Sequence, residues 1–317
     1  AFRTGKPEAE QLLLETCRDP ESPAFTRAGA MLALRRFISE ASYDEARKNL
    51  DANDSVVRVA AISKLEDLPD VDAHRDLITL LNDPVRSVRT EAARILARVP
   101  ETLFSPEELE LFQQVFGELE LRYTSNLDRP ESHLSLGILS ENRNQPEKAE
   151  KHYRKAIRRE GTYVPARMNL ATLLSRRGKN KEAEKILNEA VELQPTWGQV
   201  HYSLGLLLAE DRNRLPEAIR SLERASAYWK DNPRLFNNLA IAYWQSDKID
   251  DAINTFLQAI RLQPDNPEFL QNVVQLLVQR ERWVDALPYA RSMVRLLPTN
   301  PQAQAFLAQI ERKAQAQ

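Results

Sequence analysis

The chain has 317 residues, of which 42% are hydrophobic and 28% charged, and its formal net charge is −2. This composition indicates a globular chain of one large or two ordinary domains, and the balanced charge gives no reason to expect nucleic-acid or membrane binding. No run of 18 apolar residues occurs, so we predict no transmembrane segment. Glycine is scarce, whereas the helix-favouring residues Ala, Leu, Glu, Arg and Gln are abundant. The chain begins with Ala1 rather than Met, as expected of a processed protein or a part of a longer one.

The first hundred residues repeat with a period of 31, as the spacing of Arg27, Arg58 and Arg89 shows. In the third copy, NDPVRSVRTEAARILARV, we expect Asp83 and Pro84 to cap and start a helix with one apolar stripe. This form resembles the second helix of a HEAT repeat. We therefore predict HEAT-like repeats over 1–100, with helix pairs at 6–36, 42–66 and 71–98.

The segment 101–129 is predicted to contain a connecting helix. SPEELELFQQVFGELELRY opens with Ser105 as a cap, a proline and two glutamates, and then shows a wide apolar face. This pattern favours a rigid helix packed into the repeats on both sides over a flexible linker. We interpret Glu107, Glu108 and Glu110 as charges that favour a helix start rather than as catalytic carboxylates.

After Pro130 the period changes to 34, with Leu-Gly or Leu-Ala pairs in one helix and alanines in the next. Small residues recur where two helices would cross closely, which is the tetratricopeptide pattern of paired helices. The third unit is one residue longer than the others, and we place the extra residue in the turn EDRNRLPE. The resulting all-α solenoid has five tetratricopeptide repeats over 130–300 and a capping helix at 301–317. The repeats are 130–163, 164–197, 198–232, 233–266 and 267–300.

Sequence motifs for catalysis or cofactor binding are absent. No phosphate-binding loop, zinc-protease, serine-hydrolase or C-x-x-C motif occurs, and the one cysteine, Cys17, excludes a C-x-x-C-H haem site. Of the four histidines, His133 and His201 occupy the same place in their repeats, so we interpret them as packing residues rather than metal ligands. We predict that the chain is not an enzyme and holds no metal or cofactor of its own.

The inner helix of each tetratricopeptide repeat faces the concave side of the solenoid, and repeat positions 2, 5, 6, 9, 12 and 13 usually look into it. Position 6 is Ser135, Asn169, Ser203, Asn238 and Asn272 in the five repeats. From positions 5, 6, 9 and 12–13 we predict a peptide-binding or partner-binding surface. Its residues are Met168, Asn169, Thr172, Arg176, Tyr202, Asn237, Asn238, Ile241, Trp244, Gln271, Asn272 and Gln275.

Two interpretations of the position-6 asparagines stay open. The Lys and Asn of the carboxylate clamp that holds chaperone tails are missing at positions 5 and 9. Asn169, Asn238 and Asn272 instead resemble part of the asparagine ladder of O-GlcNAc transferase, whose carboxamides bind a peptide backbone. In the alternative, each asparagine is half buried and bonds the backbone of the neighbouring repeat.

Charge is unevenly distributed, and the segment 145–185 has twelve Lys or Arg against five Glu. It includes Lys155, Arg158 and Arg159 on an outer helix. We interpret this stretch as a solvated outer face rather than a partner-binding patch. Aromatic residues are not interleaved with the basic ones, so we predict no nucleic-acid binding.

The order of HEAT units followed by tetratricopeptide units resembles the C-terminal region of bacterial multihaem c-type cytochromes. Segments that carry this likeness include LNDPVRSVRTEAARILARVP, DRPESHLSLGIL and ALPYARSMVRLLP. The resemblance implies a periplasmic or extracellular scaffold beside electron-transfer haems, with haem on a partner or an upstream region; a cytoplasmic protein is the alternative. The leading hypothesis is therefore a scaffold that binds a protein or peptide in its concave face, possibly a multihaem cytochrome. The alternatives are a structural spacer and an accessory domain of an enzyme encoded elsewhere.

Overall fold

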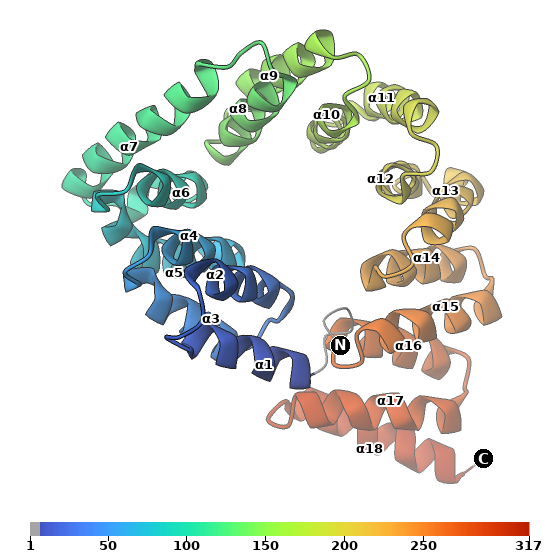
Figure 1. Cartoon of the computed structure of the whole chain (residues 1–317). Coiled ribbons are helices and arrows are strands. Elements are labelled where there is room, and N and C mark those ends of the chain that lie inside the picture. The colour runs from blue at the N-terminus through green and yellow to red at the C-terminus, as the bar shows by residue number, and fades with distance from the viewer. Residues whose placement is uncertain (1–6, 317) are drawn as a thin grey trace. The chain divides into compact units, whose positions relative to one another are not determined.

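A computed structural model describes the backbone of residues 7–316 and the side chains of residues 8–316. The first residue of the predicted pair 6–36 and the last of the predicted cap 301–317 lie outside the described residues. Over the described residues the fold is all-α, with eighteen α-helices, six short 3-10 helices and no strand (Figure 1). The predicted α-solenoid class is therefore confirmed.

The chain divides into two compact units, Ala1–Ala166 and Arg167–Gln317. The first contains α1 (Pro7–Arg18), α2 (Ala24–Ala33), α3 (Glu40–Lys48), α4 (Ser55–Lys64), α5 (Asp70–Leu77), α6 (Arg86–Leu96), α7 (Pro106–Thr124), α8 (Pro130–Asn142) and α9 (Pro146–Arg159). The boundary falls within α10 (Val164–Arg176). The second unit continues with α11 (Asn180–Leu193), α12 (Gly198–Ala209), α13 (Leu215–Tyr228), α14 (Pro233–Gln245), α15 (Ile249–Leu262), α16 (Pro267–Gln279), α17 (Trp283–Leu296) and α18 (Pro301–Gln315).

Two of the three arginines with the 31-residue period, Arg58 and Arg89, join their helix to the next part of the first unit. Arg58 donates through Nε and Nη2 to the carboxylate of Asp83, at 2.8 and 3.0 Å, and through Nη1 to the carbonyls of Ala52 and Asn53. Thirty-one residues later, Arg89 bonds the carboxylate of Glu118 and the carbonyls of Asp83 and Pro84. The sequence period thus corresponds to a repeated side-chain contact. Assignment of these helix pairs to HEAT repeats stays a prediction.

One detail of the predicted third copy was wrong. The helix begins at Arg86, two residues after Pro84, and Val85 rather than Asp83 is its cap residue. The physical reason is that the Asp83 carboxylate is engaged by Arg58 and by the backbone N–H of Val85. It therefore stabilises the turn before the helix instead of the first helical turn.

The connecting segment forms a single long helix, α7, within the first unit. Ser105 and Glu108 make a capping box, in which each side chain accepts the backbone N–H of the other residue. Phe112, Val115 and Leu119 are buried in the core that α7 shares with α1–α6 and with Leu139 of α8. Glu108 therefore serves the helix end, and the same role for Glu107 and Glu110 stays a prediction.

In the second unit, consecutive helices pair in antiparallel fashion, and the small residues lie where they cross. Ala218, Ala225, Ala252 and Ala259 are fully buried at these crossings. A Cβ added to Gly205 would lie 2.7 Å from Cγ of Leu222 on the paired helix, so only glycine allows this approach. In this unit Figure 1 shows α12, α14 and α16 on the inner side of the arc and α13 and α15 on the outer side.

In four of the five predicted repeats the turn between the two helices has a left-handed residue, at Asn144, Gly178, Asp247 and Glu281. The third repeat departs from this pattern because its extra residue replaces the turn by a 3-10 helix, Arg212–Arg214, that Asp211 caps. An insertion in this turn leaves the flanking helices α12 and α13 closely packed on each other.

Candidate functional site

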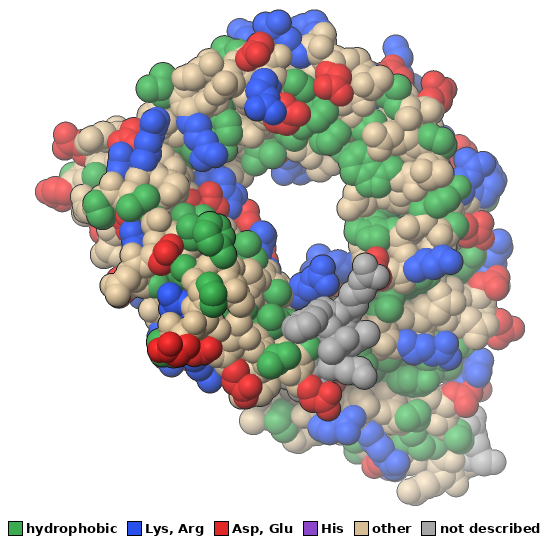
Figure 2. Space-filling model, in the orientation of Figure 1, with side chains coloured by type: hydrophobic (Ala, Val, Ile, Leu, Met, Phe, Trp, Pro, Cys, Tyr) green, Lys and Arg blue, Asp and Glu red, His purple; other side chains and the backbone are tan. Residues whose placement is uncertain are grey.

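The inner helices of the second unit bring most of the predicted surface residues onto one face. Positions 5, 6, 9 and 12 of a helix lie on neighbouring turns, so their side chains share one side. This face is formed by α12, α14 and α16, and Figure 2 shows hydrophobic side chains over α12 and α14 with most charged side chains toward the outer helices. The inner face is therefore suited to an uncharged partner segment.

Two of the three position-6 asparagines bond the repeat before them. Asn238 donates through Nδ2 to the Tyr202 hydroxyl at 2.7 Å, and Asn272 donates through Nδ2 to Oδ1 of Asn237 at 3.0 Å. In both cases the acceptor is the position-5 side chain of the preceding repeat, not its backbone as the structural alternative supposed. Burial raises the pKa of Tyr202, while the bond from Asn238 opposes that rise. These contacts fix the orientation of Asn238 and Asn272, and each of the two still has a carbonyl oxygen and a second N–H without a partner in the pair.

Trp244 continues this pattern of contacts between repeats. Its indole Nε1 donates to Oε1 of Gln279 at 3.1 Å, and its ring packs edge-on against Phe256 with centroids 6.4 Å apart. The indole is thus fixed by one polar and one aromatic partner, and the residue is half buried. Ile241, the position-9 residue of the same helix, is also half buried.

Among the described residues, Met168, Asn169 and Thr172 of α10 make no side-chain hydrogen bond to this row. The hydroxyl of Thr172 donates to the carbonyl of Met168 at 3.0 Å, so it is turned toward its own helix. Asn169 is half buried, and its predicted counterpart at position 5 of the preceding repeat is Leu134, which has no polar side-chain atom. Arg176 is exposed at the end of the helix. The bonded row accordingly runs from Tyr202 to Gln279.

A groove of about 460 Å³ lies at the end of this face. Gln271 and Gln275, both predicted site residues, line it from α16. The other lining residues come from α17, α18 and the turn between them and are Met293, Leu297, Asn300, Gln302, Ala303 and Phe306. No charged side chain lines the groove, which combines carboxamides with an apolar floor.

Three carboxamides in the groove are available to a ligand. The side chains of Gln271, Gln275 and Gln302 make no hydrogen bond to any described residue. Asn300, in contrast, is used as the cap of α18, since its Oδ1 accepts from the N–H groups of Gln302 and Ala303. A free carboxamide offers two donors and one acceptor, which match the N–H and C=O of an extended peptide.

Sequence reasoning missed the contribution of α18 to this groove. Treated as a cap, the segment 301–317 was not numbered like a repeat. With Pro301 as position 1, Gln302 falls at position 2 and Phe306 at position 6, both of which look into the concave side. Continuing the repeat numbering through the cap would have found both residues.

Residues 143–207 and 209–276 match a family model of the tetratricopeptide repeat. The chain contains tetratricopeptide repeats. The matched residues include the bonded row from Tyr202 to Asn272 and the α16 side of the groove. The exact bounds of the five repeats and of the capping helix stay predictions.

Several solved structures are similar to this chain at low sequence identity. PilF of Pseudomonas aeruginosa is 19% identical, with 76% of this chain and 99% of that chain covered and a TM-score of 0.50. MamA of Desulfovibrio magneticus RS-1 from residue 41 is 18% identical, with 53% and 93% covered and a TM-score of 0.47. YrrB, described as having an unusual peptide-binding site, is 17% identical, with 58% and 95% covered and a TM-score of 0.48. No curated protein matches the chain.

The described residues also bear on a metal site, a membrane-spanning helix and a reactive cysteine or histidine. No group of three or more His, Cys, Asp or Glu that could hold a metal ion occurs between residues 7 and 316. No helix in that part of the chain has the length and hydropathy needed to cross a membrane. Burial raises the pKa of the Cys17 thiol to about 11, which disfavours the reactive thiolate. His201 is buried and pairs with the carbonyl of Pro195, at 2.8 Å from Nε2.

Proposed function

We propose that the chain is an interaction scaffold that binds an extended, uncharged peptide segment of a protein partner in the groove between α16 and α18. Tetratricopeptide repeats mediate protein and peptide binding, and no enzyme family is indicated by the match. The observation that carries the proposal is that Gln271, Gln275 and Gln302 hold unused carboxamides beside the apolar floor of Met293 and Phe306.

The expected binding mode follows from this pairing of groups. The three glutamines bond the backbone of the peptide, which gives affinity without a strict sequence requirement. An apolar or aromatic side chain of the peptide enters the floor of the groove and gives the anchor. The row from Tyr202 to Gln279 lies next along the inner helices and holds its asparagines in fixed orientation for a longer segment.

A selection experiment tests the proposal. Peptides are selected from a random displayed library on the whole chain, and their affinities are compared for the wild type and for the triple variant Gln271→Ala, Gln275→Ala, Gln302→Ala. The matched control is Gln113→Ala, Gln114→Ala, Gln258→Ala, three exposed glutamines outside the groove. We expect uncharged peptides whose affinity falls at least tenfold in the first variant and is unchanged in the control. Equal affinities for all three proteins would reject the groove as the site.

The spacer alternative has one observation in its favour. The bonds of Asn238 and Asn272 join neighbouring repeats, as a rigid assembly arm requires. If the chain is a spacer, no displayed peptide should bind the inner face, whereas substitutions in the bonded row from Tyr202 to Gln279 should lower the free energy of unfolding. The selection experiment therefore separates the two functions.

An extracytoplasmic setting beside a multihaem cytochrome, with haem on the partner or on an upstream region, is the finer part of the proposal. It is supported by the sequence resemblance alone. The coding sequence upstream of residue 1 tests it: C-x-x-C-H codons and an export signal are expected. An open reading frame that starts near residue 1 and encodes no export signal would count for the cytoplasmic alternative.

A further inference from the structure

A second pocket lies in the first unit, and basic residues line it instead of carboxamides. It has a volume of about 410 Å³ and is lined by Leu127, His133, Lys155, Arg158 and Arg159. We call it the His133 pocket. The helices α8 and α9 form an antiparallel pair that is side by side in Figure 1, so the first turn of α8 meets the last turn of α9. His133 lies in the first turn of α8, Arg158 and Arg159 lie in the last turn of α9, and Lys155 lies one turn earlier.

The three cations of the pocket have no acidic partner. On the same helix, Lys148 is 3.3 Å from Glu120 and Arg154 is 2.8 Å from Glu150. Lys155, Arg158 and Arg159, in contrast, make no ion pair with any described residue. Three unpaired positive charges around one pocket repel one another, and a bound anion would reduce this repulsion. Exposed cations are ordinarily stabilised by water, but these three also line one pocket together with the buried ring of His133.

His133 supplies the polar wall of the pocket. It is only 3% exposed, and its Nδ1 lies 3.3 Å from Nδ1 of His152. Burial, followed by the charges of Lys155, Arg159 and Arg158, lowers the pKa of His133, so the ring is neutral at pH 7. When Nδ1 accepts the proton of His152, the hydrogen of His133 sits on Nε2, which no described residue takes. The ring then presents one neutral donor to whatever fills the hollow.

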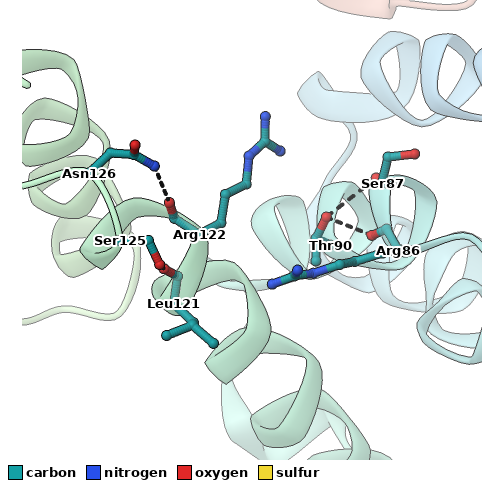
Figure 3. Close-up of a pocket in the computed structure, with 7 residues that line it drawn as sticks. All are labelled: Arg86, Ser87, Thr90, Leu121, Arg122, Ser125 and Asn126. Carbon is teal, nitrogen blue, oxygen red and sulfur yellow. Dashed lines mark hydrogen bonds between the residues drawn. The ribbon is translucent and has the colours of Figure 1, made fainter.

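Another basic hollow in the same unit lacks these properties. It lies between α6 and α7, has about 520 Å³, and is shown in Figure 3. Its Arg86 is already engaged by Glu118, whose carbonyl accepts from Nη2 at 3.1 Å. As Figure 3 shows, Thr90 donates to the carbonyl of Arg86, and Asn126 donates to the carbonyl of Arg122 at the end of α7. The His133 pocket is therefore the better anion site.

We propose that the His133 pocket binds a phosphate group, either as the free ion or as a monoester. Three cations match a doubly charged oxyanion better than a single carboxylate, and guanidinium groups present paired donors to its oxygens. The Nε2–H of His133 contributes a further donor from the buried wall. The pocket also lies at the start of α8, where no side chain caps the helix and the dipole favours negative charge.

Titration of the whole chain with inorganic phosphate at constant ionic strength tests this assignment, with the ¹⁵N shift of His133 Nε2 and calorimetry as readouts. Arg158→Gln and Arg159→Gln remove exposed side chains and leave the core intact. Each is expected to weaken phosphate binding roughly tenfold, because one charge-assisted hydrogen bond is lost. The matched control is Lys148→Gln, which removes one positive charge from the same helix but outside the pocket, and it should change the affinity less than twofold.

The arms of the titration separate the possible sources of the group. Binding of O-phosphoserine at least as tight as that of phosphate would support the site for a group carried on a larger molecule. Binding of inorganic phosphate alone would support a free-ion site. An unchanged His133 resonance, an equal response to acetate, or equal loss in Lys148→Gln and Arg158→Gln would overturn the proposal. None of these outcomes depends on peptide binding to the α16–α18 groove.

Discussion

The side-chain amide of Asn272 donates a hydrogen bond to the side chain of Asn237, with Nδ2 and Oδ1 3.0 Å apart. Asn237 is 2% exposed, so its carbonyl would lack a partner in the core if Asn272 were absent. The same geometry links Asn238 to Tyr202 one repeat earlier. Asn238 and Asn272 therefore join neighbouring repeats, and each keeps a carbonyl oxygen and a second N–H for a ligand.

Replacing Asn272 with Ala should lower the free energy of unfolding by about 1–2 kcal/mol, because the Asn237 carbonyl loses its donor. In the double variant Asn237→Ala, Asn272→Ala the loss should be smaller than the sum of the single losses, since the two residues interact directly. Urea unfolding of the four proteins measures this. Additive losses would mean that the bond contributes nothing to stability.

Gly137 and Gly117 should respond in opposite directions to alanine. A Cβ at Gly137 would lie 2.3 Å from Cε1 of the fully buried Tyr153 ring, so Gly137→Ala should destabilise by roughly 1–3 kcal/mol. Gly117 is an exposed residue inside α7 with nothing within 4 Å of an added Cβ. Gly117→Ala should therefore stabilise by about 0.5–1 kcal/mol through helix propensity. Thermal unfolding of both variants is the measurement, and a shift of the same sign in both would contradict this account of the α8–α9 crossing.

The buried pair Arg58–Asp83 should be far more costly to break than an exposed pair. Both side chains are at most 10% exposed, and Asp83→Ala leaves the guanidinium buried without its carboxylate. We expect a loss of about 3–5 kcal/mol. The exposed pair Arg75–Asp72 is the control, and Asp72→Ala should cost less than about 1 kcal/mol. Similar losses in the two variants would show that the arginine period has no structural importance.

Lys64 should give the first unit a distinct pH dependence. Its ammonium donates to the carbonyl of Phe37 at 2.9 Å and lies over the Tyr43 ring, and burial lowers its pKa from 10.5 to about 8. Between these two values the unfolded chain binds more protons than the folded one, so the stability that Lys64 confers rises with pH. Below about pH 8 both states are protonated and this contribution no longer changes.

The variant Lys64→Met isolates this effect, because all other titrations cancel in the difference. The free energy of unfolding of the wild type minus that of the variant should increase by roughly 1–3 kcal/mol from pH 7.5 to 10. Denaturant unfolding at the two pH values provides the numbers. A constant or falling difference would show that Lys64 keeps an ordinary pKa in the folded chain.

Much of the architecture could be predicted from the sequence because periodicity reports packing directly. Alanines at fixed spacing predicted the helix crossings, and Ala218, Ala252 and Ala259 are fully buried there. The length of the third repeat predicted an altered turn, which is the 3-10 helix Arg212–Arg214. The start of α6 was misplaced because a local cap rule could not foresee that Arg58, 25 residues earlier, takes the Asp83 carboxylate.

The candidate site was less accessible to sequence reasoning. Position numbering selected Gln271 and Gln275 for the concave face, and both line the groove. It could not show whether an asparagine bonds its neighbour, because that depends on the side chain one repeat away, such as Tyr202 or Asn237. The His133 pocket was hidden for a similar reason: Lys155, Arg158 and Arg159 form a uniform basic stretch in sequence, and only the α8–α9 pairing brings His133 to them.

Peptide binding in the α16–α18 groove rests on its free carboxamides, which we propose bond the peptide backbone. The most direct test follows the side-chain NH₂ resonances of Gln271, Gln275 and Gln302 during titration with an uncharged selected peptide. We expect all three to shift with one common dissociation constant, while the Asn272 side-chain NH₂ resonance keeps its position because Asn272 stays bonded to Asn237. Saturation of the protein by the peptide with all three glutamine resonances unmoved would contradict it.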